Sequence, residues 1–215
     1  MPIVTFNAAR KIPGHERTPF ALYLDMPEPR DGDVLALLEQ GDPRGFDLAY
    51  ARYAERVFAF LLRLSRSRPL AQDLFQHTFM RLAEVGPRLR TDSDLRAWLF
   101  SVARNAFHSH ARSARSARVE AGADVEHFPT PVAASTSPDA GLGLADVERA
   151  LARLNASDRE LLLLFAVEGL SHPELSKVFS LDQATVRKRV SRARARLAEA
   201  LDEDTRAMSK SRLSE

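Results

Sequence analysis

The chain has 215 residues, enough for one or two domains, and 45% of them are hydrophobic, which permits packed cores. The formal net charge is only +2, and the absence of cysteine excludes disulfides, thiolate zinc sites and thiol redox sensing. The longest apolar run, residues 161–167, is far short of a membrane span, and the N-terminus lacks the basic start and apolar core of a signal peptide. We therefore expect a soluble cytoplasmic protein without a membrane partner, and the low aromatic content with abundant Ala, Leu and Arg favours an all-α fold.

The first part of the chain divides into an extension and a helical domain. Residues 1–32 contain five prolines and no sustained hydrophobic period, which predicts a mostly flexible extension. Residues 33–118 are expected to form four helices, over 34–40 with Asp33 as the cap, over 44–65, over 70–85, and from about Asp94 onward. The last of these has five arginines and no acidic residue between positions 95 and 118, so it should present a basic surface.

The composition changes abruptly over residues 119–143. This segment holds three prolines, three glycines, four acidic residues and no Lys or Arg, which predicts an acidic linker. Helical patterning resumes at Leu144 and defines a second domain, residues 144–202, before a tail over 203–215. In this domain Ser157 is expected to cap a helix with Glu160 at the capping-box position, and residues 161–167 should be buried nearly all round.

Residues 171–197 predict two helices joined by a tight turn. Ser171 and Glu174 stand at capping-box spacing, and Asp182 is placed to cap the second helix. One stripe of that helix is apolar at helical period: Val186, Val190, Ala193 and Leu197. Its other faces carry six cations: Arg187, Lys188, Arg189, Arg192, Arg194 and Arg196. A solvated face would usually mix charge signs, whereas no acid occurs here, so we interpret the pair as a DNA-binding helix-turn-helix.

The sequence argues against catalysis. His108 and His110 are two residues apart on a helix and point about 200° apart, so they cannot share a metal ion. Asp73 and His77 share a helix face, but a single pair of this kind is more often a surface contact than a site. The chain has no glycine-rich phosphate loop, nucleophile elbow or metal-ligand cluster. We predict a protein that is not an enzyme and that needs no cofactor or metal.

Five segments occur in a diagnostic order. The first domain contains GDPRGFDLAYARYAERV, AQDLFQHTFMRL and RAWLFSVARN, and the second contains LNASDRELLLLFAVEGLSHPELSKV and TVRKRVSRARARL. Over residues 33–202 the chain resembles the extracytoplasmic-function sigma factors of bacterial RNA polymerase, which have only the second and fourth sigma regions. The resemblance implies two small helical domains, region 2 over 33–118 and region 4 over 144–202. It also implies a transcription initiation factor that directs core polymerase to promoters under anti-sigma or other signal control.

The resemblance assigns roles to particular positions. Region 2 would dock on the clamp helices of the largest polymerase subunit, and region 4 on the flap of the second largest. The positions implied for core polymerase are Asp73, Gln76 and Phe79; for the −10 element Arg88, Arg90, Arg104 and Asn105; for the −35 element Thr185, Arg187, Lys188, Ser191 and Arg192. An arginine can bind guanine edges in the major groove, and an asparagine amide suits an extruded base. The acidic linker would follow the RNA-exit path of the polymerase or serve as a plain spacer.

The chain also departs from the family pattern. Ser180 replaces the usual turn glycine and should adopt a positive φ, and Leu89 replaces a common aromatic in the loop. Gln72 and His77 replace acidic residues of the polymerase-docking helix. Two hypotheses follow for that helix. Either the remaining contacts suffice and an anti-sigma factor provides the control, or a Ser/Thr kinase adds the missing charge at Ser65, Ser67 or Thr78.

Two other functional classes remain open on the sequence alone. A transcription activator with a related helix-turn-helix would bind promoter DNA without polymerase and would not need the first domain. A protein that only mimics a sigma factor to occupy an anti-sigma factor would not need six cations on its last predicted helix.

Overall fold

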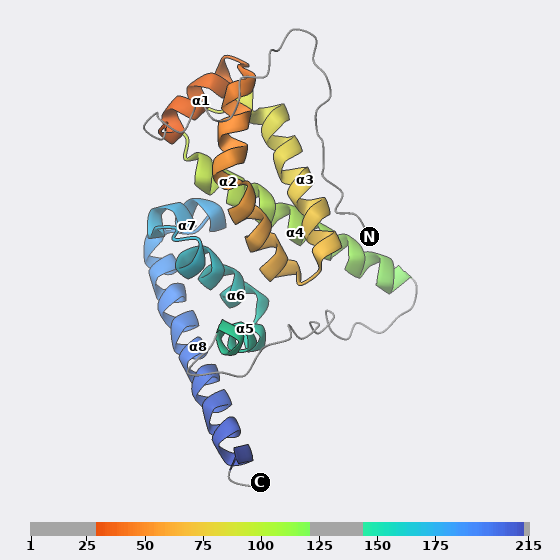
Figure 1. Cartoon of the computed structure of the whole chain (residues 1–215), viewed down its shortest axis with the longest axis vertical. Helices are drawn as coiled ribbons and strands as arrows, with labels where there is room; N and C mark the ends of the chain where they lie inside the picture. Colours follow the sequence, from red (N-terminus) through yellow and green to blue (C-terminus); the bar gives the residue numbers. More distant parts are fainter. Residues whose placement is uncertain (1–28, 121–143, 213–215) are drawn as a thin grey trace. The chain divides into compact units, whose positions relative to one another are not determined.

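The computed structural model describes the backbone of residues 29–120 and 144–212, and all the regular secondary structure in these ranges is helical. The predicted extension over 1–32 and the acidic linker over 119–143 therefore fall almost wholly outside the described residues. Residues 31–215 belong to one compact unit. We refer to helices α1 to α4 as the N-terminal half of this unit and to α5 to α8 as its C-terminal half (Figure 1).

The N-terminal half consists of helices that pack against one another. They are α1 (Asp31–Glu39), α2 (Pro43–Ser65), α3 (Arg68–Val85), a 3₁₀ turn (Gly86–Arg88) and α4 (Leu95–Glu120). The predicted apolar faces are buried, and the cluster that they form includes Val57, Leu61, Leu82 and Phe100. α2 contacts α1, α3 and α4, so it lies at the centre of this half.

Two helix starts differ from the sequence prediction because side chains near them provide caps or anchors. α1 begins at Asp31, two residues before the predicted cap Asp33. Its Asp31 carboxylate accepts hydrogen bonds from Tyr53 Oη at 2.7 Å and from Arg52 Nη1 at 2.7 Å, both on α2. α3 begins at Arg68 rather than Leu70, because Ser67 is the N-cap and proline is well tolerated in the first turn of a helix. Arg66, directly before this cap, has the left-handed φ of 53°.

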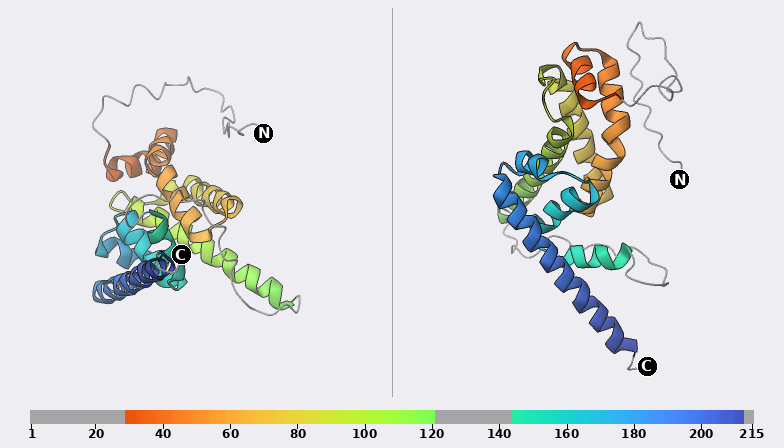
Figure 2. Two further views of the ribbon diagram at one scale, coloured as in Figure 1. Left: turned by 60° about the horizontal axis from the view of Figure 1, so that its bottom comes forward. Right: turned by 90° about the vertical axis from the view of Figure 1, so that its left-hand side faces the viewer.

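The C-terminal half contains a helix-turn-helix and a long last helix. Its elements are α5 (Leu144–Arg153), α6 (Ala156–Leu162), a π-helical turn (Leu163–Val167), α7 (His172–Phe179) and α8 (Gln183–Arg212). α8 runs far beyond the predicted end near Leu197 and forms one continuous helix (Figure 2). α5, α6 and α7 all contact it, so the apolar stripe of α8 holds this half together.

The predicted cap of α6 was wrong. Asn155, not Ser157, is the N-cap, because the Asn155 side chain accepts the amide of Asp158 at 2.9 Å. Glu160 therefore has no capping role and its side chain is buried. The prediction that residues 161–167 are buried nearly all round holds for Leu161 to Leu164 but fails at the end of the run, where Val167 is 48% exposed.

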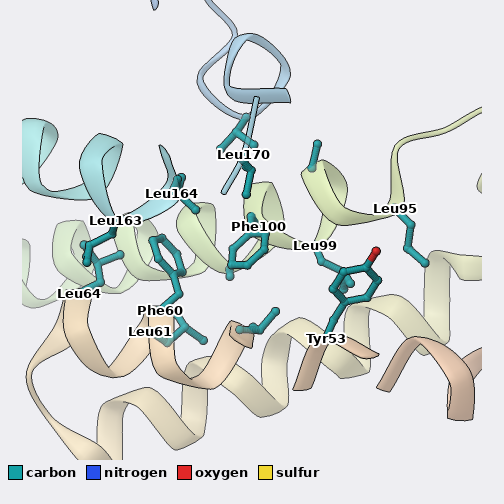
Figure 3. Packing of buried hydrophobic residues seen from close by; sticks show 14 of the residues in the cluster. Tyr53, Phe60, Leu61, Leu64, Leu95, Leu99, Phe100, Leu163, Leu164 and Leu170 are labelled. Carbon is teal, nitrogen blue, oxygen red and sulfur yellow. The ribbon is translucent and has the colours of Figure 1, made fainter. Parts of the chain in front are cut away.

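The two halves share one hydrophobic cluster. Figure 3 shows Leu163, Leu164 and Leu170 of the C-terminal half beside Phe60 of α2 and Phe100 of α4. The rings of Phe60 and Phe100 meet edge to face with centroids 5.5 Å apart. Because these five side chains are almost fully buried, the halves are in apolar contact.

Candidate nucleic-acid interface

The turn between α7 and α8 is fixed by capping hydrogen bonds. Ser171 Oγ accepts the Glu174 amide at 3.4 Å and the Glu174 carboxylate accepts the Ser171 amide at 2.7 Å, so the predicted capping box is confirmed. Asp182 caps α8, since its carboxylate accepts the Thr185 amide at 2.8 Å and the Thr185 hydroxyl at 2.6 Å. These bonds from Thr185 lower the pKa of Asp182. Ser180 has φ 53°, so the predicted positive φ is confirmed as well.

α8 separates a buried stripe from a basic surface. Val186, Val190 and Ala193 are buried as predicted, and Leu197 is partly buried. Five of the six cations are exposed: Arg187, Lys188, Arg192, Arg194 and Arg196. Two of the six have structural contacts. Arg196 Nη1 makes an ion pair with Asp158, and the half-buried Arg189 guanidinium lies over the ring of Phe179 and donates to Ser157 Oγ. We call the other four, Arg187, Lys188, Arg192 and Arg194, the recognition face.

The residues predicted for the −35 element gather on this side of α8. Ser191 is exposed next to Arg187, Lys188 and Arg192, so these four can reach a ligand without any rearrangement of the helix. Thr185 is half-buried and its hydroxyl donates to Asp182. Thr185 therefore serves first as part of the α8 cap.

The residues predicted for the −10 element do not form one surface. Arg88 and Arg90 are exposed in the segment between α3 and α4, and Arg90 Nη2 donates to Asp92 at 2.9 Å. Arg104 and Asn105 follow each other on α4 and so point about 100° apart. Asn105 is exposed and lines a groove between α3 and α4, whereas Arg104 faces the C-terminal half.

The basic side chains of α4 that face the C-terminal half meet carboxylates that are buried or partly buried. Arg104 Nε lies 2.9 Å from Glu160 Oε1, and its guanidinium stands 4.6 Å from the ring centroid of Phe179. His108 Nε2 lies 3.0 Å from the same Glu160 oxygen. Arg96 Nε donates to Glu174 Oε1 at 2.7 Å. Arg104 Nε is nevertheless the one buried side-chain polar atom among the described residues without a well-aligned hydrogen bond, so its pairing with Glu160 is imperfect.

A further contact of the same kind involves α2. Arg56 Nε donates to Glu168 Oε2 at 3.1 Å, and Glu168 is 5% exposed. Burial raises the pKa of Glu168, although Arg56 opposes that shift. Burial would also raise the pKa of Glu174, but hydrogen bonds from Arg96 and Ser171 outweigh it and lower the pKa. Together with Glu160, these residues place three carboxylates of the C-terminal half against cations of α2 and α4.

The predicted polymerase-docking helix, α3, has one exposed face. Asp73 and Gln76 are exposed on it, as is His77. Phe79, the third predicted residue, is only 4% exposed and packs against Phe75 with ring centroids 4.8 Å apart. Phe79 therefore cannot contact a partner directly in this structure and supports the docking face from beneath. Thr78 is also fully buried and donates to the Leu74 carbonyl at 2.8 Å, which leaves the partly buried Ser65 and Ser67 as the candidates for modification.

Sequence reasoning missed two features of these surfaces. Met80 is 63% exposed on α3 and adds an apolar side chain to the predicted docking face. Spacing could have found it, since Asp73, Gln76 and Met80 follow each other at three- and four-residue intervals. The contacts of Glu160, Glu168 and Glu174 with basic side chains of the N-terminal half had no comparable signal, because each joins residues at least 52 positions apart.

Neither a metal site nor a membrane span is visible in the described ranges. There, no three His, Asp or Glu side chains are grouped in a way that could hold a metal ion. In the same residues, none of the helices combines the length and the apolar character that crossing a bilayer requires.

Comparison with known proteins identifies both halves. The family model for Sigma-70 region 2 matches residues 49–117, and the model for Sigma-70 region 4 matches residues 144–197. The fold and the helix-turn-helix thus define a sigma factor of RNA polymerase.

Comparison with individual relatives shows which type of sigma factor the chain is. The RNA polymerase sigma factor CarQ of Myxococcus xanthus is 32% identical over 166 residues, which cover 76% of this chain and 92% of CarQ. The ECF RNA polymerase sigma factor SigM of Bacillus subtilis is 32% identical over 154 residues, 70% of this chain and 91% of SigM. The sigma factor RpoE of Bartonella quintana, solved in complex with the anti-sigma factor NepR, superposes with a TM-score of 0.62 at 32% identity and covers 73% of this chain and 96% of RpoE. The chain belongs to the extracytoplasmic-function sigma factors.

Proposed function

We propose that this chain binds core RNA polymerase and directs it to promoters through their −10 and −35 elements. The observation that carries the proposal is the recognition face, four exposed cations on a capped helix whose opposite stripe is buried. Such a helix can enter the major groove while its cations contact base edges and phosphates. The family of the chain supplies the polymerase as its partner.

The two halves divide the work. The exposed face of α3, with Asp73, Gln76 and Met80, docks on the clamp helices of the polymerase, and region 4 contacts the flap. Arg192 and Lys188 recognise the −35 element. Arg88, Arg90 and Asn105 are accessible to the −10 element in this structure, whereas Arg104 becomes accessible only when the C-terminal half moves away.

The chain itself performs no chemistry in this proposal. Phosphodiester bond formation belongs to the polymerase, and the chain contributes promoter selection in the cytoplasm, where the polymerase works. An anti-sigma factor is the proposed control, as two similar sigma factors, RpoE and CnrH, were solved with anti-sigma factor NepR and with the cytosolic domain of CnrY.

Reconstitution with core polymerase tests the function. Purified chain is mixed with core polymerase, co-elution is measured by size exclusion, and run-off transcription is measured on a library of genomic fragments. We expect co-elution and a small set of discrete transcripts. Binding to promoter fragments without polymerase would indicate an activator instead. Co-elution with a candidate anti-sigma factor but not with polymerase would indicate a mimic.

A further inference from the structure

α1 lies along the first part of the segment between α3 and α4, residues 86–91. At the end of α1, Gly86 lies so close to Leu38 that a methyl group on its Cα would stand 3.2 Å from Leu38 Cδ2. At the start of α1, a methyl group on Gly32 would stand 3.7 Å from the Thr91 carbonyl oxygen, so the two backbones are neighbours there. α1 and the neighbouring α3 both pack against the 3₁₀ turn (Figure 1). The segment therefore rests on α1 at two points that are about 9 Å apart along the helix.

The segment 86–91 combines a packed base with exposed cations. Gly86 is buried, and Leu89 packs against the hydrophobic cluster. The Leu89 amide donates to the Gly86 carbonyl at 3.0 Å and closes the turn between them. Arg88 and Arg90, both predicted for the −10 element, are exposed. Their position therefore depends on how the base of the segment is held.

The first turn of α1 is anchored to α2 by hydrogen bonds to a charged group. Tyr53 Oη lies 2.7 Å from both oxygens of the Asp31 carboxylate and donates its proton to them, and Arg52 Nη1 donates to Asp31 Oδ1 at 2.7 Å. Tyr53 is 4% exposed, and burial together with the hydrogen bond to Asp31 raises its pKa, so its hydroxyl remains a donor. Hydrogen bonds to an ionised group are stronger than those between neutral groups. Asp31 therefore fixes the end of α1 that lies beside Thr91.

The last turn of α1 is fixed by close packing. A methyl group on Gly45 would stand 2.7 Å from the Leu38 amide nitrogen, so the start of α2 packs directly on the backbone of α1. Leu38 is 4% exposed, and its Cδ2 is the side-chain atom that approaches Gly86 most closely. A densely packed interior transmits a small displacement to its neighbours. A shift of α1 relative to α2 would therefore move Gly86 and the residues that follow it.

We propose that Asp31 is a positioning residue for −10 recognition, which acts through α1 on the segment 86–91 and so determines where Arg88 and Arg90 meet DNA. The inference rests on the proposed function, because it requires these two arginines to contact the −10 element. Binding residues on a loop depend on the scaffold that holds the loop, and a lost supporting contact leaves the site present but loose. Neither Asp31 nor Tyr53 has to touch the promoter for this effect.

Two substitutions in the full chain test the anchor. Tyr53→Phe removes only the hydroxyl, and Asp31→Asn removes the charge. Run-off transcription with core polymerase is measured from a promoter that the parent uses and from templates with one base pair changed in the −10 or in the −35 element. We expect both variants to reduce the preference for the intact −10 element roughly threefold to tenfold, since a complete base contact discriminates by about tenfold or more. The preference for the intact −35 element should not change.

Tyr50→Phe is the matched control. It removes the same hydroxyl from the same helix at a side chain that is 42% exposed, and it should change neither preference. Tyr53→Phe keeps the buried ring, so it remains informative if Asp31→Asn fails to fold. Binding of Tyr53→Phe and Asp31→Asn to core polymerase, measured by co-elution, should equal that of the parent, because neither residue lies on the exposed face of α3.

Hydrogen exchange provides a local readout that needs no polymerase. We expect amide exchange over residues 86–93 to be several-fold faster in Tyr53→Phe and Asp31→Asn than in the parent and Tyr50→Phe, with the amides of α8 unchanged. An unchanged −10 preference in both variants would overturn the inference even with faster exchange, since the anchor would then be only structural. An equal loss of preference for both promoter elements would overturn it as well. Run-off transcription by the parent is measured first, so a failure of the proposed function appears in the parent and a failure of this inference only in the variants.

Discussion

α4 and α8 are two basic helices that differ in what lies against them. Both have long stretches without an acidic residue, and the sequence predicts a nucleic-acid surface for each. On α8 the cations at 187, 188, 192 and 194 are exposed, whereas on α4 Arg96 and Arg104 are paired with carboxylates from the other half. A run of cations in the sequence therefore predicts that a surface is basic, but it does not predict whether that surface is accessible to a ligand. Accessibility depends on how segments that are distant in the sequence pack against each other.

Loss of the recognition face should have the largest effect on promoter use. We expect Arg192→Ala and Lys188→Ala each to reduce promoter-specific transcription roughly tenfold or more, because a good base contact contributes about 1–3 kcal/mol of discrimination. Binding to core polymerase, measured by co-elution, should not change, since both residues lie on the exposed side of α8. An equal loss of core binding would contradict the assignment of this helix to DNA.

The affinity for core polymerase tests whether the exposed face of α3 needs additional negative charge. If the missing acids at positions 72 and 77 weaken docking, Gln72→Glu with His77→Glu should tighten core binding several-fold, because two carboxylates are added to an exposed face for which we propose a basic partner surface. The kinase hypothesis predicts the same gain from phosphorylation of Ser65 or Ser67. Ser67 is the N-cap of α3, where a phosphate is also favoured by the helix dipole.

The control for this prediction is Ala83→Glu, which adds one carboxylate at another exposed position of α3, as Gln72→Glu alone does. It should improve core binding less than Gln72→Glu. Tight binding by the unmodified chain that the two acids do not improve would rule out the phosphorylation switch and leave the anti-sigma factor as the control.

The pairing between the halves should give opposite pH dependences to two carboxylates. Burial raises the pKa of Glu168, so the stability that it contributes is present below its unfolded pKa and is lost as pH rises through the folded value. The pKa of Glu174 is lowered by Arg96 and Ser171 in spite of burial, so its contribution is present above its unfolded pKa and is lost as pH falls through the folded value.

The measurement is the free energy of unfolding of Glu168→Gln and Glu174→Gln relative to the parent, by urea titration between about pH 3 and pH 7. As pH rises, the free energy of unfolding relative to the parent should increase for Glu168→Gln and decrease for Glu174→Gln, by about 1 kcal/mol in each case. The charged neighbours Arg56, Arg63 and Arg96 act in the lowering direction on the pKa of Glu168, where burial outweighs them, and Arg96 also lowers the pKa of Glu174. Parallel slopes for the two variants would contradict the pairing.

Much of the fold was predictable because its determinants are local. The capping box at Ser171, the cap at Asp182, the positive φ of Ser180 and the buried stripe of α8 all follow from residues within one or two helical turns. The start of α6 was mispredicted because two residues, Asn155 and Ser157, are both good caps and only the packed structure selects between them.

The candidate site was only partly predictable. The accessible residues of the −35 surface depend on one helix, so periodicity placed them on one side. The −10 candidates Arg104 and Asn105 point to different surroundings, and the burial of Phe79 depends on aromatic neighbours of α2 and α3. No spacing rule connects Glu160 with Arg104, since 56 positions separate them and the contact exists only after the two halves pack.

Two residues other than glycine adopt a left-handed backbone in the described chain, Arg66 and Ser180, and both stand at the turn directly before a helix with a proposed partner. A left-handed residue with a side chain carries local strain of order 1 kcal/mol. Glycine would remove that strain but would also give the unfolded chain more freedom, so the net change in stability should be small. With glycine at either position, the direction of the following helix would be less well defined. These two turns therefore restrict the directions in which α3 and α8 can point. The chain tolerates local backbone strain at Arg66 and Ser180, and the two helices with proposed partners have defined orientations.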